Sequence, residues 1–137
     1  MADSARIRVL EANQNLLTAI AKGDYVTYSN LCVEDLTCFE NETQGHLMVG
    51  LPFHKTFFDL PPPPRTTVSS SMIVTMANPH VRFLDDEHYT SAICCYTRFN
   101  QKVNGDGECI ITTCCETRVW KWDTSSGQYK CVHVHKS

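Results

Sequence analysis

Three cationic residues lie in predicted strands at positions where apolar side chains are expected. Arg98, Arg118 and Lys136 belong to the runs 89–99, 109–122 and 129–136, which are rich in β-branched, aromatic and small residues. Side chains alternate between the two faces of a strand, so each cation shares a face with residues that a core would bury. A buried cation without a partner is costly, and these three therefore need a carboxylate, water or an anionic ligand.

The residues expected beside these cations are mostly apolar, and so are those on the opposite face. The expected neighbours are Ala92, Cys94 and Tyr96 for Arg98, Trp120 and Trp122 for Arg118, and Val132 and Val134 for Lys136. A sheet with helices on one side should be polar on its other side. Here the other side is also mostly apolar, so a second surface must cover it, and self-association of the chain would supply that surface. The residues predicted for this outer face are Ile93, Cys95, Thr97, Phe99, Ile111, Cys115, Val119, Cys131 and His133.

Cations inside a concave sheet would form a site for a small carboxylate. His54, from a short helical segment, and the aromatic side chains of Tyr96 and Trp120 would complete that site. Internal pairing of Arg98 and Arg118 is an equally good interpretation. The candidate carboxylates for such pairing are Glu40, Glu42 and Glu116.

The register of one hairpin decides whether the two arginines meet. Arg98 and Arg118 fall on the same face if the loop around residues 104–107 has an odd number of residues, or if one strand carries a bulge. An even loop without a bulge would separate them. The sequence leaves this open, and the pocket requires the first arrangement.

Histidines are the candidates for a general base, but nothing in the sequence completes a catalytic set. The pair His133 and His135 shares a strand face, which permits a metal site, yet a third ligand at recognisable spacing is lacking. A histidine on a strand face is more often a hydrogen-bonded wall residue. No nucleophile elbow, P-loop or dinucleotide fingerprint is present. We therefore expect no catalytic residue, no metal and no cofactor. The histidines considered are His54, His80, His133 and His135.

Eight cysteines are unusual for a chain of 137 residues. Their spacing lacks the two-residue gap of zinc knuckles, and the adjacent pairs lie in strand-like runs, where neighbours point to opposite faces. Without a recognisable secretion signal, reduced thiols that act as small core residues are favoured over disulfides or metal ligands. They are Cys32, Cys38, Cys94, Cys95, Cys109, Cys114, Cys115 and Cys131.

Length and charge favour one domain that binds neither nucleic acid nor membrane. Residues 1–137 suffice for one core, and the formal net charge is -3 with no long basic run. A protein that binds the nucleic-acid backbone needs a clustered cationic surface, which is missing. No stretch is long enough to span a membrane, and the first residues do not resemble a secretion signal. We expect a cytoplasmic protein.

The order of predicted elements is helices first and a meandering antiparallel sheet afterwards, an α+β architecture. Helices are expected at 1–22, after a cap at Asp24, and at 50–58, with a stop at Gly23. Four prolines, Pro61 to Pro64, predict a stiff extended loop. Strands are expected at 36–39, 68–76, 80–84, 89–99, 109–122 and 129–135.

An ordered set of short motifs resembles the association (hub) domain of calcium/calmodulin-dependent protein kinase type II. The resemblance covers nearly the whole chain, and its specificity comes from the order of the pieces. The motifs are Gly23-Asp24-Tyr25 with Tyr28, Leu36-Thr37-Cys38-Phe39-Glu40, Gly50-Leu51-Pro52-Phe53-His54, Asn78-Pro79-His80-Val81, Tyr96-Thr97-Arg98, Glu116-Thr117-Arg118-Val119-Trp120 and Val132-His133-Val134-His135.

This resemblance implies a cone-shaped fold like that of nuclear transport factor 2, with N-terminal helices on a curved antiparallel sheet. It also implies a homo-oligomeric, two-layered ring of a dozen or more subunits. The family's cavity has a histidine and three arginines, and by motif these positions are His54, Arg98, Arg118 and Lys136. Lysine keeps the charge there but lacks the planar fork that grips a carboxylate. The proline loop also departs from the family pattern.

The expected function is therefore a non-catalytic oligomerisation scaffold with an anion pocket of His54, Arg98, Arg118, Lys136 and Tyr96. The partners implied are further copies of the chain, a kinase in cis or in trans, and a small carboxylate. Kinase signatures are absent from these 137 residues. The alternative is an isomerase or dehydratase of the same cone fold, and a monomeric or dimeric transport adaptor is a third class.

Overall fold

The computed structural model describes residues 2–60 and 72–137. The prolines Pro61 to Pro64 and the first part of the strand expected at 68–76 lie outside the described residues. The elements, in chain order, are α1 (Ala2–Lys22), α2 (Tyr25–Asn30), β1 (Cys32–Phe39), a 3-10 turn η1 (Asn41–Thr43), β2 (Met48–Val49), α3 (Leu51–Asp59), β3 (Ile73–Phe83), β4 (Ser91–Val103), β5 (Cys109–Asp123) and β6 (Gln128–Lys136).

The helices begin and end at the residues whose chemistry predicts it. Gly23 takes a left-handed backbone conformation, with φ of 68°, directly after α1. The carboxylate of Asp24 then accepts a hydrogen bond of 3.1 Å from the backbone N–H of Thr27 and caps α2. The third helix begins at Leu51 with proline in its first turn. All three predicted helices are confirmed.

The six strands of the described residues form one sheet in the order β2-β1-β6-β5-β4-β3. Strands β3 to β6 are the predicted antiparallel meander. The expectation of a wholly antiparallel sheet needs one correction, because β1 pairs parallel to β6. The two strands are nearly a hundred residues apart in sequence, and local alternation carries no information on the direction in which such strands pair.

The described part of the strand predicted at 68–76 and the strand predicted at 80–84 belong to one strand, β3. The register with β4 shifts between Ala77 and His80, and pairing then resumes. Asn78 has φ of 50°, which is compatible with a bulge. A bulge accommodates the missing N–H of Pro79, so the proline bends the strand without ending it.

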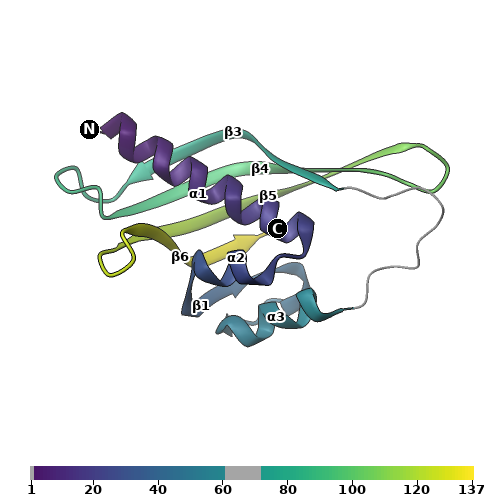
Figure 1. The fold of residues 1–137 in the computed structure, drawn as a ribbon, viewed down its shortest axis with the longest axis horizontal. Coiled ribbons are helices and arrows are strands. Elements are labelled where there is room, and N and C mark those ends of the chain that lie inside the picture. Colours follow the sequence, from purple (N-terminus) through teal and green to yellow (C-terminus); the bar gives the residue numbers. More distant parts are fainter. Residues whose placement is uncertain (1, 61–71) are drawn as a thin grey trace.

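The helices and the core lie on one face of the sheet. In Figure 1, α1 runs along the sheet, and α2 and α3 lie near β1. Trp120 of β5 donates a hydrogen bond of 2.9 Å to the side-chain oxygen of Asn13 of α1, and both side chains are fully buried. Leu16 and Leu17 of α1 are also fully buried. Burial of this apolar stripe holds the helix on the sheet.

The β4–β5 hairpin places Arg98 and Arg118 on the same face. Val103 pairs with Cys109, so the loop spans the five residues 104–108, and the register continues without a shift. Arg98 lies opposite Cys114, and Arg118 opposite Cys94. Because cross-strand partners share a face, the condition that the sequence left open is met.

A bulge in β6 corrects two expectations about its faces. Val119 pairs with His133 and Trp120 with Cys131, so Val132 is an extra residue in β6. Cys131 therefore lies on the helix-covered face with Val134, in the place expected for Val132, and is fully buried. The assignment of Cys131 to the outer face was wrong, because strict alternation fails at a bulge.

The cysteines divide into core and surface residues, although all eight were expected in the core. Cys32, Cys38, Cys94 and Cys131 are buried, whereas Cys95 and Cys114 are half-buried. Cys109 and Cys115 are exposed on the protomer, which corrects the expectation for these two. Both point away from the helices, and alternation along β5 does not tell which of its two faces the helices cover. The eight thiols are free, as predicted.

Candidate functional site

A pocket of about 190 Å³ lies between the helices and the sheet, and four of the predicted site residues line it. His54 comes from α3, Arg98 from β4, Arg118 from β5 and Lys136 from β6. The fifth, Tyr96, is buried behind the pocket and contacts Arg118. The other lining residues are Ile20, Tyr28, Glu40, Glu42, Phe57 and Phe58.

Glu116 joins the two arginines behind the pocket. Its carboxylate, which is fully buried, accepts a hydrogen bond of 2.9 Å from Nη1 of Arg98 and lies 3.4 Å from Nε of Arg118. The hydroxyl of Tyr96 donates to the same carboxylate and accepts a hydrogen bond of 3.1 Å from Nε of Arg118. The internal pairing considered from the sequence is therefore present, with Glu116 as the partner.

This pairing sets the protonation state of the cluster. Burial alone would raise the pKa of Glu116, but Arg118 and Arg98 outweigh it and lower that pKa to about 2. Burial works against the charge of Arg118, yet Glu116 raises the pKa of that guanidinium further above its usual range. Burial also raises the pKa of Tyr96. At neutral pH, Glu116 is thus ionised, and Tyr96 keeps the proton that it donates.

Lys136 lies at the more open side of the pocket. Its ammonium group is 3.6 Å from a carboxylate oxygen of Glu42, and 21% of the lysine side chain is exposed. The pocket wall also contains Glu40, whose pKa is raised by burial. Three cations and three carboxylates therefore surround this site, and its charge is more balanced than the three cations alone indicated.

His54 is a neutral group in this pocket. It is 4% exposed, and its Nδ1 lies 2.8 Å from the hydroxyl of Tyr28. Burial, followed by the nearby Arg118, lowers the pKa of His54 to about 4. Its Nε2 is buried and has no hydrogen-bond partner among the described residues. Around neutral pH, His54 therefore offers one unpaired ring nitrogen and no positive charge.

The remaining histidines lie elsewhere. Nδ1 of His133 is 2.7 Å from the hydroxyl of Thr37, and the ring of Phe39 contacts both His133 and His135. His80 is exposed on β3. The view of His133 as a hydrogen-bonded wall residue agrees with these contacts.

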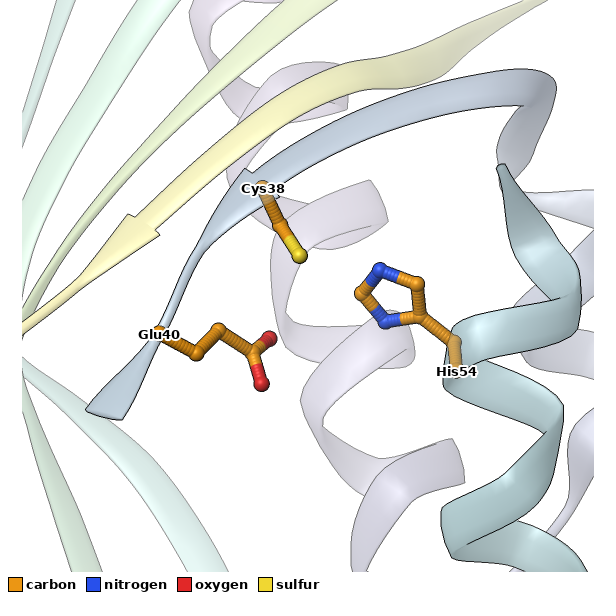
Figure 2. A group of neighbouring side chains, drawn as sticks. All are labelled: Cys38, Glu40 and His54. Atoms are coloured by element: carbon orange, nitrogen blue, oxygen red, sulfur yellow. The ribbon is translucent and has the colours of Figure 1, made fainter. Parts of the chain in front are cut away.

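Two residues of the pocket region, Cys38 and Glu40, were not predicted as site residues. Cys38 lies in β1 and Glu40 directly after its end, two residues further on, so both point to the helix-covered side, where they meet His54 (Figure 2). This two-residue spacing could have paired the cysteine with the glutamate. The contact with α3 is tertiary, and sequence spacing cannot reveal it.

Acid should destabilise the protein in two stages. A histidine with a lowered pKa in the folded state binds protons more readily when the protein is unfolded. The contribution of His54 therefore lowers the free energy of unfolding as pH falls from 6.5 to about 4. Glu116 adds a loss as pH falls from 4.5 to about 2. Each shift corresponds to roughly 3 kcal/mol at its limit. Urea unfolding at a fixed protomer concentration measures this loss across the pH range.

The matched variant His54→Gln should flatten the upper stage only. Glutamine does not titrate, so its unfolding midpoint should be nearly constant down to the region where Glu116 is protonated. A parent midpoint that does not change between neutral pH and about 4 would contradict the protonation state given to His54.

An α1 helix with two short helices on one face of a mixed, curved sheet is the cone-shaped α+β fold of nuclear transport factor 2-like proteins. A nuclear transport factor 2-like protein from Salmonella enterica matches 100% of the chain with a TM-score of 0.70 at 18% identity. A dehydratase-like protein of the same fold from Streptomyces avermitilis matches with a TM-score of 0.72 at 16% identity. At such identities, the likeness concerns the fold alone. The predicted fold class is confirmed.

Within this fold, the chain belongs to the calcium/calmodulin dependent protein kinase II association domain family, whose sequence profile matches residues 6–137. The hub homology domain from Chlamydomonas reinhardtii is 42% identical, with a TM-score of 0.85 and 97% of each chain covered. The association domain from Caenorhabditis elegans is 32% identical, with a TM-score of 0.83 over 98% of this chain and 96% of that one.

The full-length kinase type II of Caenorhabditis elegans is 33% identical over 94% of this chain, but the match spans only 16% of that kinase. The corresponding kinase of Caenorhabditis briggsae is also 33% identical, and 22% of its length is spanned. The family resemblance predicted from the motifs is confirmed. The matched region is the association domain, which is a hub and not the catalytic part of these kinases.

Proposed function

We propose that this chain is a homo-oligomeric scaffold that closes into a two-layered ring of a dozen or more subunits. Association domains of this family form homo-oligomeric assemblies. Such a ring would hold kinase domains, in cis or in trans. The catalytic domains would then lie close enough to act on one another. The observation that carries this proposal is the apolar outer face of the sheet.

The outer face combines apolar character with incomplete burial. Ile93, Phe99 and Val119 are half-buried in the isolated protomer, and Ile111 is 54% exposed. The helices α1, α2 and α3 pack on the opposite face, near Trp120 and Tyr28, and so leave these residues uncovered. A self-complementary contact between two copies would remove this apolar surface from water.

Light scattering at micromolar protomer concentration tests the assembly. A closed ring predicts a mass above that of about eight subunits, which does not fall on moderate dilution. A protomer or an isolated dimer at that concentration would refute the ring.

We infer, as a second part of the function, that the pocket binds a small carboxylate. The cations Arg98, Arg118 and Lys136 line it together, and the neutral ring of His54 forms part of its wall. A second cavity of about 260 Å³ adjoins it and shares Arg98 and Lys136, so a short chain attached to the carboxylate would find room. Charge-assisted hydrogen bonds from guanidinium groups favour this ligand class.

Calorimetry with butyrate, and with butyramide as its neutral isostere, measures this binding. Lys136→Met removes the charge at the open side, and we expect it to weaken butyrate binding by about tenfold, the effect of one charge-assisted hydrogen bond. Lys136→Arg introduces a planar guanidinium group, which can donate two hydrogen bonds to one carboxylate, and this variant should bind butyrate more tightly than the parent. Equal affinity of all three proteins, or equal affinity for butyramide, would contradict the assignment.

An enzyme of the same fold is the weaker candidate. Its general base would be His54 or a pocket carboxylate, but Glu116 already accepts hydrogen bonds from Arg98, Arg118 and the hydroxyl of Tyr96.

No helix among residues 2–60 and 72–137 is long and apolar enough to cross a membrane. The cytoplasmic location predicted from the sequence stays a prediction.

A further inference from the structure

Cys38, Glu40 and His54 form a group of potential metal ligands beside the pocket, which Glu40 and His54 line. The thiol sulfur, a carboxylate oxygen and a ring nitrogen all lie within 4.8 Å of one another. In Figure 2, the sulfur and the carboxylate both point toward the nitrogen-bearing edge of the imidazole ring. Cys38 and His54 are buried, and Glu40 is half-buried, so these groups are held in place by the fold.

The surroundings of His54 prepare one nitrogen as a ligand. Nδ1 is 2.8 Å from the hydroxyl of Tyr28, and a histidine that binds a metal commonly donates its other ring N–H to such an acceptor. Nε2 is buried and has no hydrogen-bond partner among residues 2–60 and 72–137, and a buried polar atom without a partner is costly. A metal ion at Nε2 would remove that cost.

We propose that Cys38 Sγ, a carboxylate oxygen of Glu40 and His54 Nε2 bind a zinc ion, with the fourth position open to the pocket. Thiolate, imidazole and carboxylate together are a donor set that zinc accepts in tetrahedral sites. One thiolate and one carboxylate balance the two positive charges of the ion. Bonds of roughly 2.0 to 2.3 Å require ligand atoms about 3.5 Å apart, which small side-chain rotations can reach from the observed spacing.

The metal site and the carboxylate site are separable, although both use His54. Cys38 does not line the pocket that contains the three cations. Loss of Cys38 should therefore remove zinc and leave butyrate binding by the metal-free protein intact, whereas Lys136→Met should weaken butyrate without removing a zinc ligand. Failure of one proposal is thus distinguishable from failure of the other.

The test is zinc binding by the intact protein, measured by competition with a chromophoric chelator after metal removal and dialysis. We expect one ion per protomer, with affinity reduced at least about tenfold in Cys38→Ser, Glu40→Gln and His54→Gln. Cobalt(II) in place of zinc should give a thiolate charge-transfer band that Cys38→Ser abolishes. Circular dichroism and light scattering show whether each variant is folded and assembled.

Matched controls separate this site from exposed ligands. Cys115→Ser and His135→Gln change the same residue types on the opposite face of the sheet and should retain the parent affinity; Cys115 and His135 are exposed. Unchanged affinity in Cys38→Ser, or binding that disappears with Cys115→Ser, would overturn the proposal. If Cys38→Ser does not fold, anomalous diffraction from zinc-soaked parent crystals decides, because density away from the three ligands contradicts the site.

Discussion

Phe99→Glu should break the assembly while the protomer remains folded. Phe99 is half-buried on the outer face, and its cross-strand neighbours are Thr75 and Thr113, which offer no cation to pair with a carboxylate. In the protomer the new carboxylate stays solvated. In a subunit interface it would be buried without a partner, and the penalty of several kcal/mol recurs at every symmetry-related contact. Light scattering should show a mass far below that of the parent.

Val26→Glu is the matched control for this variant. Val26 lies in α2 and is 69% exposed, so the same kind of substitution places a charge on an exposed apolar side chain away from the outer face. Its mass should equal that of the parent. A Phe99→Glu protein that keeps the full parent mass would show that the outer face is not the surface on which subunits associate.

Glu116→Gln should cause the largest loss of stability of any single conservative change in the pocket. Its carboxylate is the shared partner of Arg98 and Arg118, whose side chains are 10% and 2% exposed. Glutamine keeps the shape but leaves two guanidinium groups close together without their counter-charge. Removing one member of a buried ion pair costs about 3–5 kcal/mol, which we expect as the loss in free energy of unfolding.

Urea unfolding in the Phe99→Glu background avoids the dependence of stability on subunit concentration. The control there is Glu42→Gln, because Glu42 pairs with Lys136 at 3.6 Å across a partly exposed contact. We expect it to lose less than about 1 kcal/mol. Equal losses for the two variants would show that Glu116 does not neutralise the buried arginines.

Local chemistry predicted the helices and the β4–β5–β6 meander. The cap at Asp24 and the stop at Gly23 act within a few residues, so they can be read directly from the chain. The location of Arg98 and Arg118 on one face depended on a single unknown, the parity of a loop, and a five-residue loop resolved it.

The features that the sequence did not predict arise from irregular backbone or from distant pairing. The bulge at Val132 moves Cys131 to the inner face, and the bulge at Asn78 and Pro79 joins two expected strands. Neither can be recognised by alternation, because a bulge breaks the alternation itself. The parallel pairing of β1 with β6 and the meeting of Cys38 with His54 depend on tertiary contacts.

The exposure of Cys109 and Cys115 was also not predicted from the sequence. Composition favoured core thiols, but both residues lie on β5 at positions where no helix of the same chain covers them. In the proposed assembly, further copies of the chain would cover such positions. The sequence therefore predicts the protomer better than the surfaces through which protomers meet.

Native mass spectrometry of the undissociated protein tests the central claim most directly, namely that the apolar back of the sheet is covered by further copies of the chain. The protomer mass is 15.5 kDa, so the number of copies follows at once from the measured mass. A two-layered ring predicts an even number of about a dozen subunits or more. A single protomer under non-denaturing conditions would contradict the scaffold and leave a solitary cone with a polar pocket.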